Sequence, residues 1–176
     1  MKKNRKIFPV LQLDFVYEQI YKELYAAILP KGCLDLLTYI ISELSANVKE
    51  HSFAKKVNIE VAIRKKSFYF RISDDGIGIK RSFIKNGIFT KDDRAAIELA
   101  VGGISTKKQN ERAFGLFSTQ RLATHTGGKM NIISGKVKAT FKENETKFEA
   151  VKKEMKGVTV EVDIPLKPVN VYEVLY

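Results

Sequence analysis

Apolar residues recur with two different spacings, one after the other, in the first half of the chain. Apolar residues first recur at spacings of 3, 4, 3 and 4, at Leu34, Leu37, Ile41, Leu44 and Val48. This spacing predicts a helix that buries one stripe of its surface. Apolar and polar residues then alternate over 57–63 and over 68–72, which predicts two strands. Because Lys65 and Lys66 separate the two runs, we expect a β-hairpin directly after the helix.

The remaining segments complete an alternation of helices and strands. We predict further helices at 15–29, from Asp92 or Asp93 to Val101, and at 114–126. Residues 80–90 are expected to be irregular and 102–113 to form a polar loop. Strands are predicted at 130–133, 136–141, 147–151 and 158–164. This order favours an α+β fold: a two-layer α/β sandwich with a mixed, mostly antiparallel sheet and helices on one face.

A single domain is expected, because 176 residues fall within the usual range for one domain. We divide it into an N-terminal extension and helix at 1–33, a core at 34–166 and a C-terminal tail at 167–176. Cys33 is the only cysteine, which excludes an intramolecular disulfide and a multi-cysteine metal site. No apolar stretch reaches membrane-spanning length and no secretory signal is evident. We therefore expect a cytoplasmic protein.

The chain is basic. It has 31 Lys and Arg against 20 Asp and Glu, a formal net charge of +11. Such an excess favours polyanionic partners, namely nucleotides, nucleic acid or an acidic protein surface. A generally lysine-rich composition would produce the same excess.

A second stripe on the helix near residue 40 contains Glu43, Asn47 and His51. Their spacing of four residues places them on one face, about 90° from the apolar stripe. A glutamate can accept a proton from water or a hydroxyl group, and an asparagine oxygen suits Mg²⁺. These types and spacings indicate a site at the rim of the core, although a solvated polar face has the same pattern.

Asp74, Gly76 and Gly78 follow the second strand of the hairpin as Asp-x-Gly-x-Gly. The glycines permit close approach of a ligand, and an ionised aspartate can accept a hydrogen bond from an amino group such as that of adenine. Asp-Gly is also common in hairpin turns, so this segment alone leaves two interpretations.

The polar loop at 102–113 precedes a predicted helix. It contains Gly103, Thr106, Lys107 and Arg112, and Gly115 and Leu116 follow it. A helix N-terminus offers free N–H groups and a positive dipole end, which suit phosphates. We expect the loop to order over a nucleotide; a mobile basic loop is the alternative.

These segments, taken in order, resemble the GHKL (Bergerat-fold) family of ATP-binding domains. Sensor histidine kinases, anti-sigma serine kinases, type II topoisomerases, Hsp90 and MutL contain such domains. Glu43 to His51 resembles the N box of the family, Asp74 to Gly78 the G1 box, and 113–116 the second glycine-rich box. The segments 128–134 and 157–165 resemble the closing strands, with Thr159 at the threonine position of the family.

The resemblance implies that the chain binds ATP and Mg²⁺. Glu43 would be the catalytic base, Asn47 would hold Mg²⁺, and Asp74 would bind the adenine amino group. The full set of implied ATP contacts is Asn47, His51, Asp74, Gly76, Gly78, Ile79, Gly103, Thr106, Lys107, Arg112, Gly115, Leu116 and Thr159.

Two departures narrow the expected function within the family. Ala113 stands where the second box usually has a glycine, and neither a phospho-acceptor hairpin nor a transducer domain is evident. The chain is most similar to stand-alone anti-sigma serine/threonine kinases, which bind a sigma factor or phosphorylate a small antagonist domain. An ATP-gated interaction module or an ATPase without kinase activity is the alternative, and a basic nucleic-acid-binding protein is a third. A homodimer is compatible with each.

Overall fold

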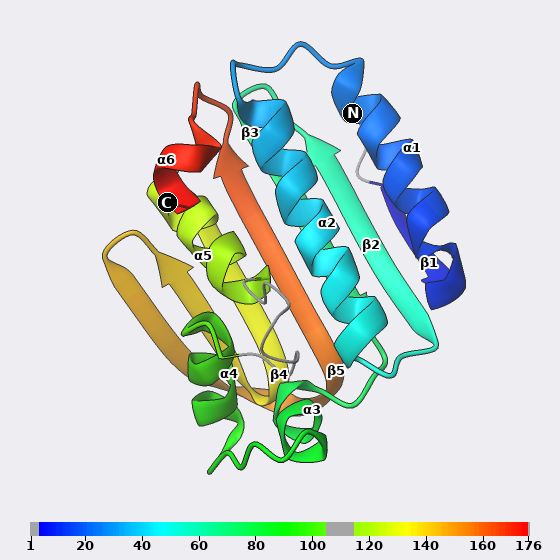
Figure 1. Cartoon of the computed structure of the whole chain (residues 1–176), viewed down its shortest axis with the longest axis vertical. Helices are drawn as coiled ribbons and strands as arrows, with labels where there is room; N and C mark the ends of the chain where they lie inside the picture. Colours follow the sequence, from blue (N-terminus) through cyan, green and yellow to red (C-terminus); the bar gives the residue numbers. More distant parts are fainter. Residues whose placement is uncertain (1–3, 105–114, 176) are drawn as a thin grey trace.

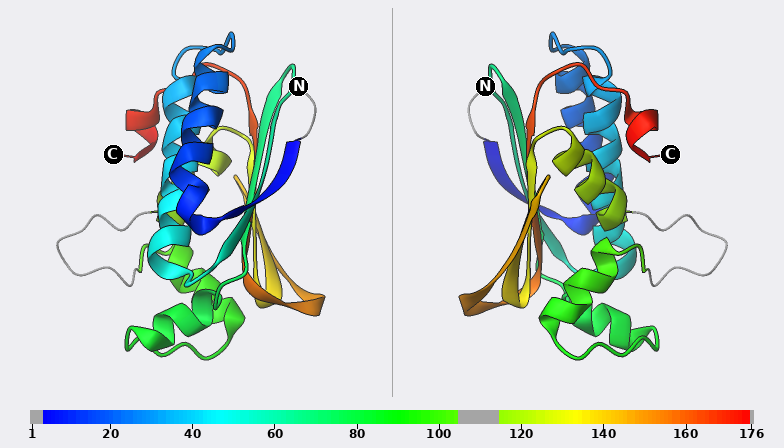
Figure 2. Two further views of the ribbon diagram at one scale, coloured as in Figure 1. Left: turned by 90° about the vertical axis from the view of Figure 1, so that its right-hand side faces the viewer. Right: turned by 90° about the vertical axis from the view of Figure 1, so that its left-hand side faces the viewer.

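Five strands form one sheet in the order β1-β2-β3-β5-β4. They are β1 (Asn4–Pro9), β2 (Lys56–Ile63), β3 (Ser67–Asp74), β4 (Lys129–Lys142) and β5 (Glu145–Pro165). This computed structural model describes residues 4–104 and 115–175. Helices cover one face of the sheet, and the side views make the two layers visible (Figures 1 and 2). The predicted two-layer α+β sandwich is confirmed, and every described strand pair is antiparallel.

The helix layer contains one short 3-10 helix and six α-helices within the described ranges. They are η1 (Val10–Gln12), α1 (Leu13–Tyr25), α2 (Cys33–His51), α3 (Ile79–Lys85), α4 (Asp93–Val101), α5 (Gly115–His125) and α6 (Val171–Leu175). The predicted cap of α4 is confirmed: the Asp92 carboxylate accepts a hydrogen bond from the Ala95 N–H at 2.8 Å. No helix in the described ranges is both long and apolar enough to cross a membrane.

Besides the short η1, three elements were not expected from the sequence. Helix α3 lies in the segment predicted to be irregular, because its seven residues are too few for a helical period to stand out. Strand β1 lies in the predicted N-terminal extension, where its backbone pairs with β2 at the edge of the sheet. Helix α6 lies in the predicted tail. The segment 1–33 therefore adds a strand and a helix to the core at 34–166.

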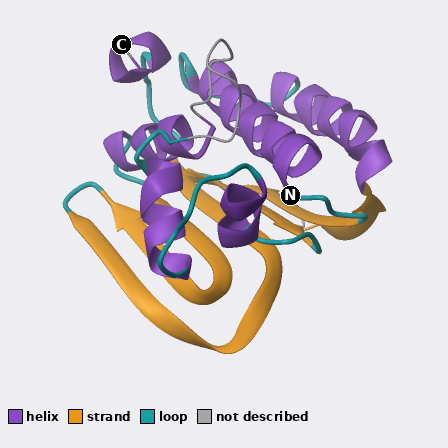
Figure 3. Cartoon of the chain, turned by 60° about the horizontal axis from the view of Figure 1, so that its bottom comes forward, coloured by secondary structure: helices purple, strands orange, loops and turns teal. Residues whose placement is uncertain are grey.

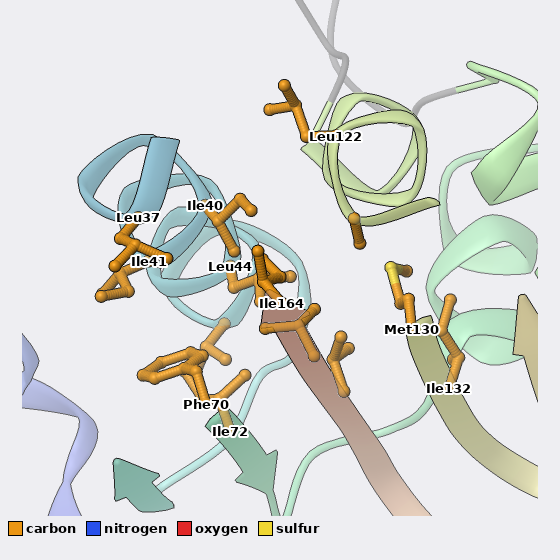
Figure 4. Close-up of a cluster of buried hydrophobic side chains, with 14 of the residues drawn as sticks. Leu37, Ile40, Ile41, Leu44, Phe70, Ile72, Leu122, Met130, Ile132 and Ile164 are labelled. Carbon is orange, nitrogen blue, oxygen red and sulfur yellow. The ribbon is translucent and has the colours of Figure 1, made fainter. Parts of the chain in front are cut away.

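The core lies between α2 and the sheet. On α2 the buried face contains Leu36 and Ile40 besides the predicted Leu37, Ile41 and Leu44. Figure 4 shows several of these side chains above Phe70 and Ile72 of β3 and Ile164 of β5. Each fully buried side chain of this size contributes about 1.5–3 kcal/mol. This packing fixes the rotation of α2 on the sheet, and therefore the direction of its second stripe.

Strands β4 and β5 form a long ribbon that doubles back on itself (Figure 3). The sequence predicted four strands from position 130 onward. The first two are the halves of β4, and the last two are the halves of β5. Their register shifts between Ser134 and Val137, where Gly135 has a φ of 58°. A Cβ at this glycine would collide with the Asp93 carboxyl group, and Asp93 accepts a hydrogen bond from the Lys136 N–H at 2.9 Å. The bend thus places the outer half of the ribbon against α4.

The doubled ribbon extends the core. Thr140 donates a hydrogen bond to Asn131 of the same strand at 2.9 Å, so the two halves of β4 lie close together. Ala139 and Phe141 consequently join the main hydrophobic core, and the Phe141 ring packs edge-on against Phe148 at 6.2 Å between centroids.

We expect Phe141→Ala to lower the free energy of unfolding by about 3 kcal/mol, because it leaves a cavity under α4. Phe141 is 3% exposed, whereas Phe89, the matched control, is 83% exposed. Phe89→Ala should therefore change stability by less than about 0.5 kcal/mol. Urea unfolding of both variants measures the difference, and equal effects would show that the outer ribbon does not contribute to the core.

Candidate functional site

A cavity opens at the end of the sheet where β3 and α2 both end. Its volume is about 920 Å³, a figure that includes the solvent in its open mouth. The C-terminal half of α2, α3 and the start of α5 lie together at this end (Figure 1). Its lining contains eight of the predicted site residues: Glu43, Asn47, His51, Asp74, Gly78, Ile79, Gly115 and Leu116.

Asp74 lies at the end of β3 and faces the helix layer. It has the same orientation as Phe70 and Ile72, because alternate residues of a strand share a face, and it is only 5% exposed. Its Oδ1 accepts a hydrogen bond from the Gly76 N–H at 2.8 Å, and its Oδ2 from the Val158 N–H at 3.3 Å. Each carboxylate oxygen has a second lone pair. The carboxylate can therefore accept another hydrogen bond from a ligand.

Burial raises the pKa of Asp74 to about 6, and the hydrogen bonds from Gly76 and Val158 oppose this rise. Desolvation disfavours the charged form, whereas donors to the carboxylate favour it. Near neutral pH the Asp74 carboxyl group is consequently ionised in most molecules and acts as an acceptor.

The neighbouring Asp75 has different partners. Its carboxylate accepts hydrogen bonds from the Lys55 and Lys56 N–H groups at 2.8 and 2.9 Å.

The packing of the protein, without any ligand, already requires a glycine at position 76. A Cβ at Gly76 would collide with the Ser52 carbonyl oxygen, and that oxygen also accepts a hydrogen bond from the Ile77 N–H at 2.9 Å. The sequence predicted close approach of a ligand here, whereas the close neighbour is the end of α2. Gly78 does line the cavity and has a φ of 82°. Ile79 follows it, and its N–H donates to Ser134 Oγ at 3.0 Å.

Asn47 meets the beginning of α5. A Cβ at Gly115 would lie 2.6 Å from Asn47 Nδ2 and 2.8 Å from Oδ1, so the two helices approach this closely only because residue 115 is a glycine. The Nδ2 atom is buried and has no hydrogen-bond partner in the part of the chain that the structure describes. A buried amide in this state favours a polar ligand beside it.

Glu43 and His51 complete the predicted stripe. All three residues of the stripe line the cavity, so the helical spacing predicted their shared face correctly. His51 ends α2, and its Nε2 lies 3.7 Å from the Glu50 carboxylate. The roles assigned to Glu43, Asn47 and His51 by resemblance stay predictions.

Thr159 is not brought to the cavity. Its neighbours Val158 and Val160 line the cavity, and successive residues of a strand point to opposite faces. The Thr159 hydroxyl instead lies 2.7 Å from Ser73 Oγ on the adjacent strand. A direct ATP contact by Thr159 is thus unsupported by its position.

The polar loop is described only in part. Gly103 has a φ of 88° and precedes Ile104, which lines the cavity. The predicted contacts Thr106, Lys107 and Arg112, with Ala113, lie outside the described residues, and so does the predicted ordering of the loop.

Sequence reasoning missed most of the cavity wall. The additional lining residues are Leu44, Ala46, Val48, Ser52, Ile72, Ser82, Phe83, Ala100, Ile104, Val158 and Val160. Most are apolar and were assigned to the core or not assigned at all. Ser82 and Phe83 could have been found only by recognising α3.

A buried carboxylate, an apolar wall and a helix N-terminus around one cavity suit a nucleotide, which offers an amino group, a flat ring and phosphates. The family model for histidine kinase-, DNA gyrase B- and HSP90-like ATPases matches residues 32–168, and the chain belongs to this family. Members of the family bind ATP, generally with Mg²⁺, which supports ATP binding here. A search of curated proteins found no significant match.

A cation at this site would depend on the nucleotide. Among the described residues no group of three or more His, Cys, Asp or Glu side chains could hold a metal ion. Mg²⁺ is commonly bound by one or two protein groups together with phosphate oxygens and water. The half-buried Asn47 amide fits such a site, because it offers one oxygen beside the beginning of α5.

We expect the free energy of unfolding to fall between about pH 4 and pH 7 by more in the wild type than in Asp74→Asn. The folded carboxyl has a pKa of about 6 against an ordinary value of 3.8, so the folded state binds the extra proton between these values. Stability is therefore lost as the pH rises through about 6. The difference corresponds to at most about 3 kcal/mol.

Urea unfolding of both proteins at the two pH values measures this change. Because the two proteins share all other titrating groups, the effects of those groups on the free energy of unfolding cancel in the difference. If the difference in the free energy of unfolding between the two proteins is the same at both pH values, Asp74 has its ordinary pKa in the folded protein.

Proposed function

We propose that the protein binds Mg·ATP in this cavity and uses it to regulate a protein partner, as a stand-alone serine/threonine kinase or an anti-sigma-type switch. The main support is the Asp74 carboxylate, which is buried at the cavity wall and holds acceptor capacity beyond its two backbone donors. Membership of the ATPase family supports the nucleotide. The kinase or switch activity rests on the sequence resemblance.

The base would lie at the Asp74 end of the cavity. Its amino group would donate to the carboxylate, and its ring would contact apolar side chains such as Ile72, Ile79 and Val160. Burial of the ring between apolar groups is favourable, while the single buried acceptor fixes its orientation. Asp74 would thereby select a base with an amino group at this edge.

The phosphates would lie toward α5. The first N–H groups of a helix have no partner within that helix, and its N-terminus favours negative charge. Helix α5 has eleven residues and begins at Gly115, beside Asn47. When bound, Mg²⁺ would neutralise phosphate charge, and the Asn47 side-chain oxygen would hold it.

Glu43 would act as the general base. It lies one helical turn before Asn47 and lines the same cavity. From this position it would accept a proton from water or from a serine or threonine hydroxyl of the partner. The charge of +11 would favour a partner with an acidic face.

We expect Asp74→Asn to weaken ATP binding about 5- to 150-fold, because it replaces an acceptor by a donor facing the adenine amino group. Isothermal titration calorimetry with Mg·ATP measures the affinity. Asp75→Asn is the matched control: Asp75 is exposed, and the amide that replaces its carboxylate would keep an oxygen for the Lys55 and Lys56 N–H groups. Equal affinities of wild type and Asp74→Asn would refute the adenine contact.

Glu43→Gln should retain ATP and lose turnover by roughly 100- to 10,000-fold, the usual effect of removing a general base. Phosphate release and transfer of labelled γ-phosphate measure turnover, and calorimetry measures binding. Asn47→Ala should show the opposite profile, with weaker Mg²⁺-dependent binding. A Glu43→Gln protein with wild-type turnover would remove Glu43 from the chemistry and favour an ATP-gated switch.

A further inference from the structure

Phe53 has an unusual backbone and directly follows the last residue of this segment that lines the cavity. Its φ is 55°, and within the described ranges it is the one non-glycine residue with a positive φ. Bulky residues rarely adopt this left-handed conformation, and it persists only where the surrounding structure imposes it. Such strained residues concentrate at functional sites, and Phe53 directly follows Ser52, which lines the cavity.

Hydrogen bonds fix the chain on both sides of Phe53. Ser52 Oγ donates to the Val48 carbonyl at 2.5 Å and accepts from the Ala54 N–H at 3.0 Å. The Ser52 carbonyl accepts from the Ile77 N–H, which lies close to Asp74 in sequence, at 2.9 Å. The loop is therefore tied to the end of α2 and to the Asp-x-Gly-x-Gly segment, which is the Asp74 end of the cavity.

Asp75 completes this attachment. Its carboxylate accepts the N–H groups of Lys55 and Lys56, and its own N–H donates to the Lys56 carbonyl at 3.2 Å. These bonds lower the pKa of Asp75, so they persist at neutral pH. They hold the residues that follow Phe53 in place.

The Phe53 side chain bridges to α3. Lys85 Nζ lies 3.7 Å from the centroid of the ring, a cation–π contact, and Lys85 ends α3 one turn after the cavity residue Ser82. The ring thus bridges the loop after α2 and the end of α3, and each of these elements contributes other residues to the lining of the cavity. Phe53 is still 58% exposed, so Lys85 covers only part of the residue.

We propose that Phe53 is a base-binding residue: its ring lies just beyond the lining of the cavity at the Asp74 end and stacks on the nucleotide base held by Asp74. An exposed aromatic ring at a site edge provides a flat apolar surface for a base. Lys85 keeps the ring in place and draws α3 toward the loop. This inference rests on the proposed ATP site and adds to it a determinant of base affinity.

The test compares Phe53→Asn with Phe53→Tyr, using Mg·ATP and magnesium tripolyphosphate as probes in calorimetry. Asparagine tolerates a positive φ but has no ring, whereas tyrosine keeps the ring. Phe53→Asn should weaken ATP binding about fivefold or more, leave tripolyphosphate binding unchanged, and leave the unfolding midpoint equal to or above that of the wild type. Phe53→Tyr should bind ATP within about twofold of wild type.

Tyr172→Asn is the control, because Tyr172 is an exposed aromatic residue, 71% exposed, on α6 at the far end of the helix layer (Figure 1). It should bind both probes as the wild type does. The inference is overturned if Phe53→Asn binds ATP normally, or if it loses ATP and tripolyphosphate to the same extent, as a merely structural role would require. Failure of the wild type to bind ATP would overturn the proposed function as well.

Discussion

The packing of α2 on the sheet determines where every other part of the site lies. Its buried face, which includes Leu37, Ile41 and Leu44, rests on the strands. The residues about 90° round the helix must then face the space beside the core. Asn47 and Asp74 consequently line one cavity, although 27 positions separate the two in the sequence.

Around this cavity, close contacts exclude side chains at particular positions. A Cβ at Gly115 would collide with Asn47, one at Gly76 with Ser52, and one at Gly157 with Asp74. Because interiors are close-packed, a methyl group at any of these positions would separate elements that share the cavity wall. The glycines in this family pattern therefore hold the site together as well as leaving room for a ligand.

A buried carboxyl group with a raised pKa and a strained backbone occur together at the cavity end of the molecule. Desolvation raises the pKa of Asp74, and Phe53 has a left-handed backbone. Each is unfavourable for folding by itself, and each is maintained by backbone hydrogen bonds from neighbouring strands and loops. Such a concentration is expected where a surface is arranged for a ligand rather than for stability.

The sequence by itself determined α2, the β2–β3 hairpin, the cap at Asp92 and the shared face of Glu43, Asn47 and His51, because local periodicity and spacing encode them. It also identified the family through its motifs. Only the tertiary structure decided the position of β1, the presence of α3, the doubled ribbon and the contact of Gly76 with Ser52. These depend on contacts between segments distant in the chain, which leave no period in the sequence. Thr159 illustrates the limit: its motif suggested a ligand contact, but strand alternation turned its side chain toward Ser73.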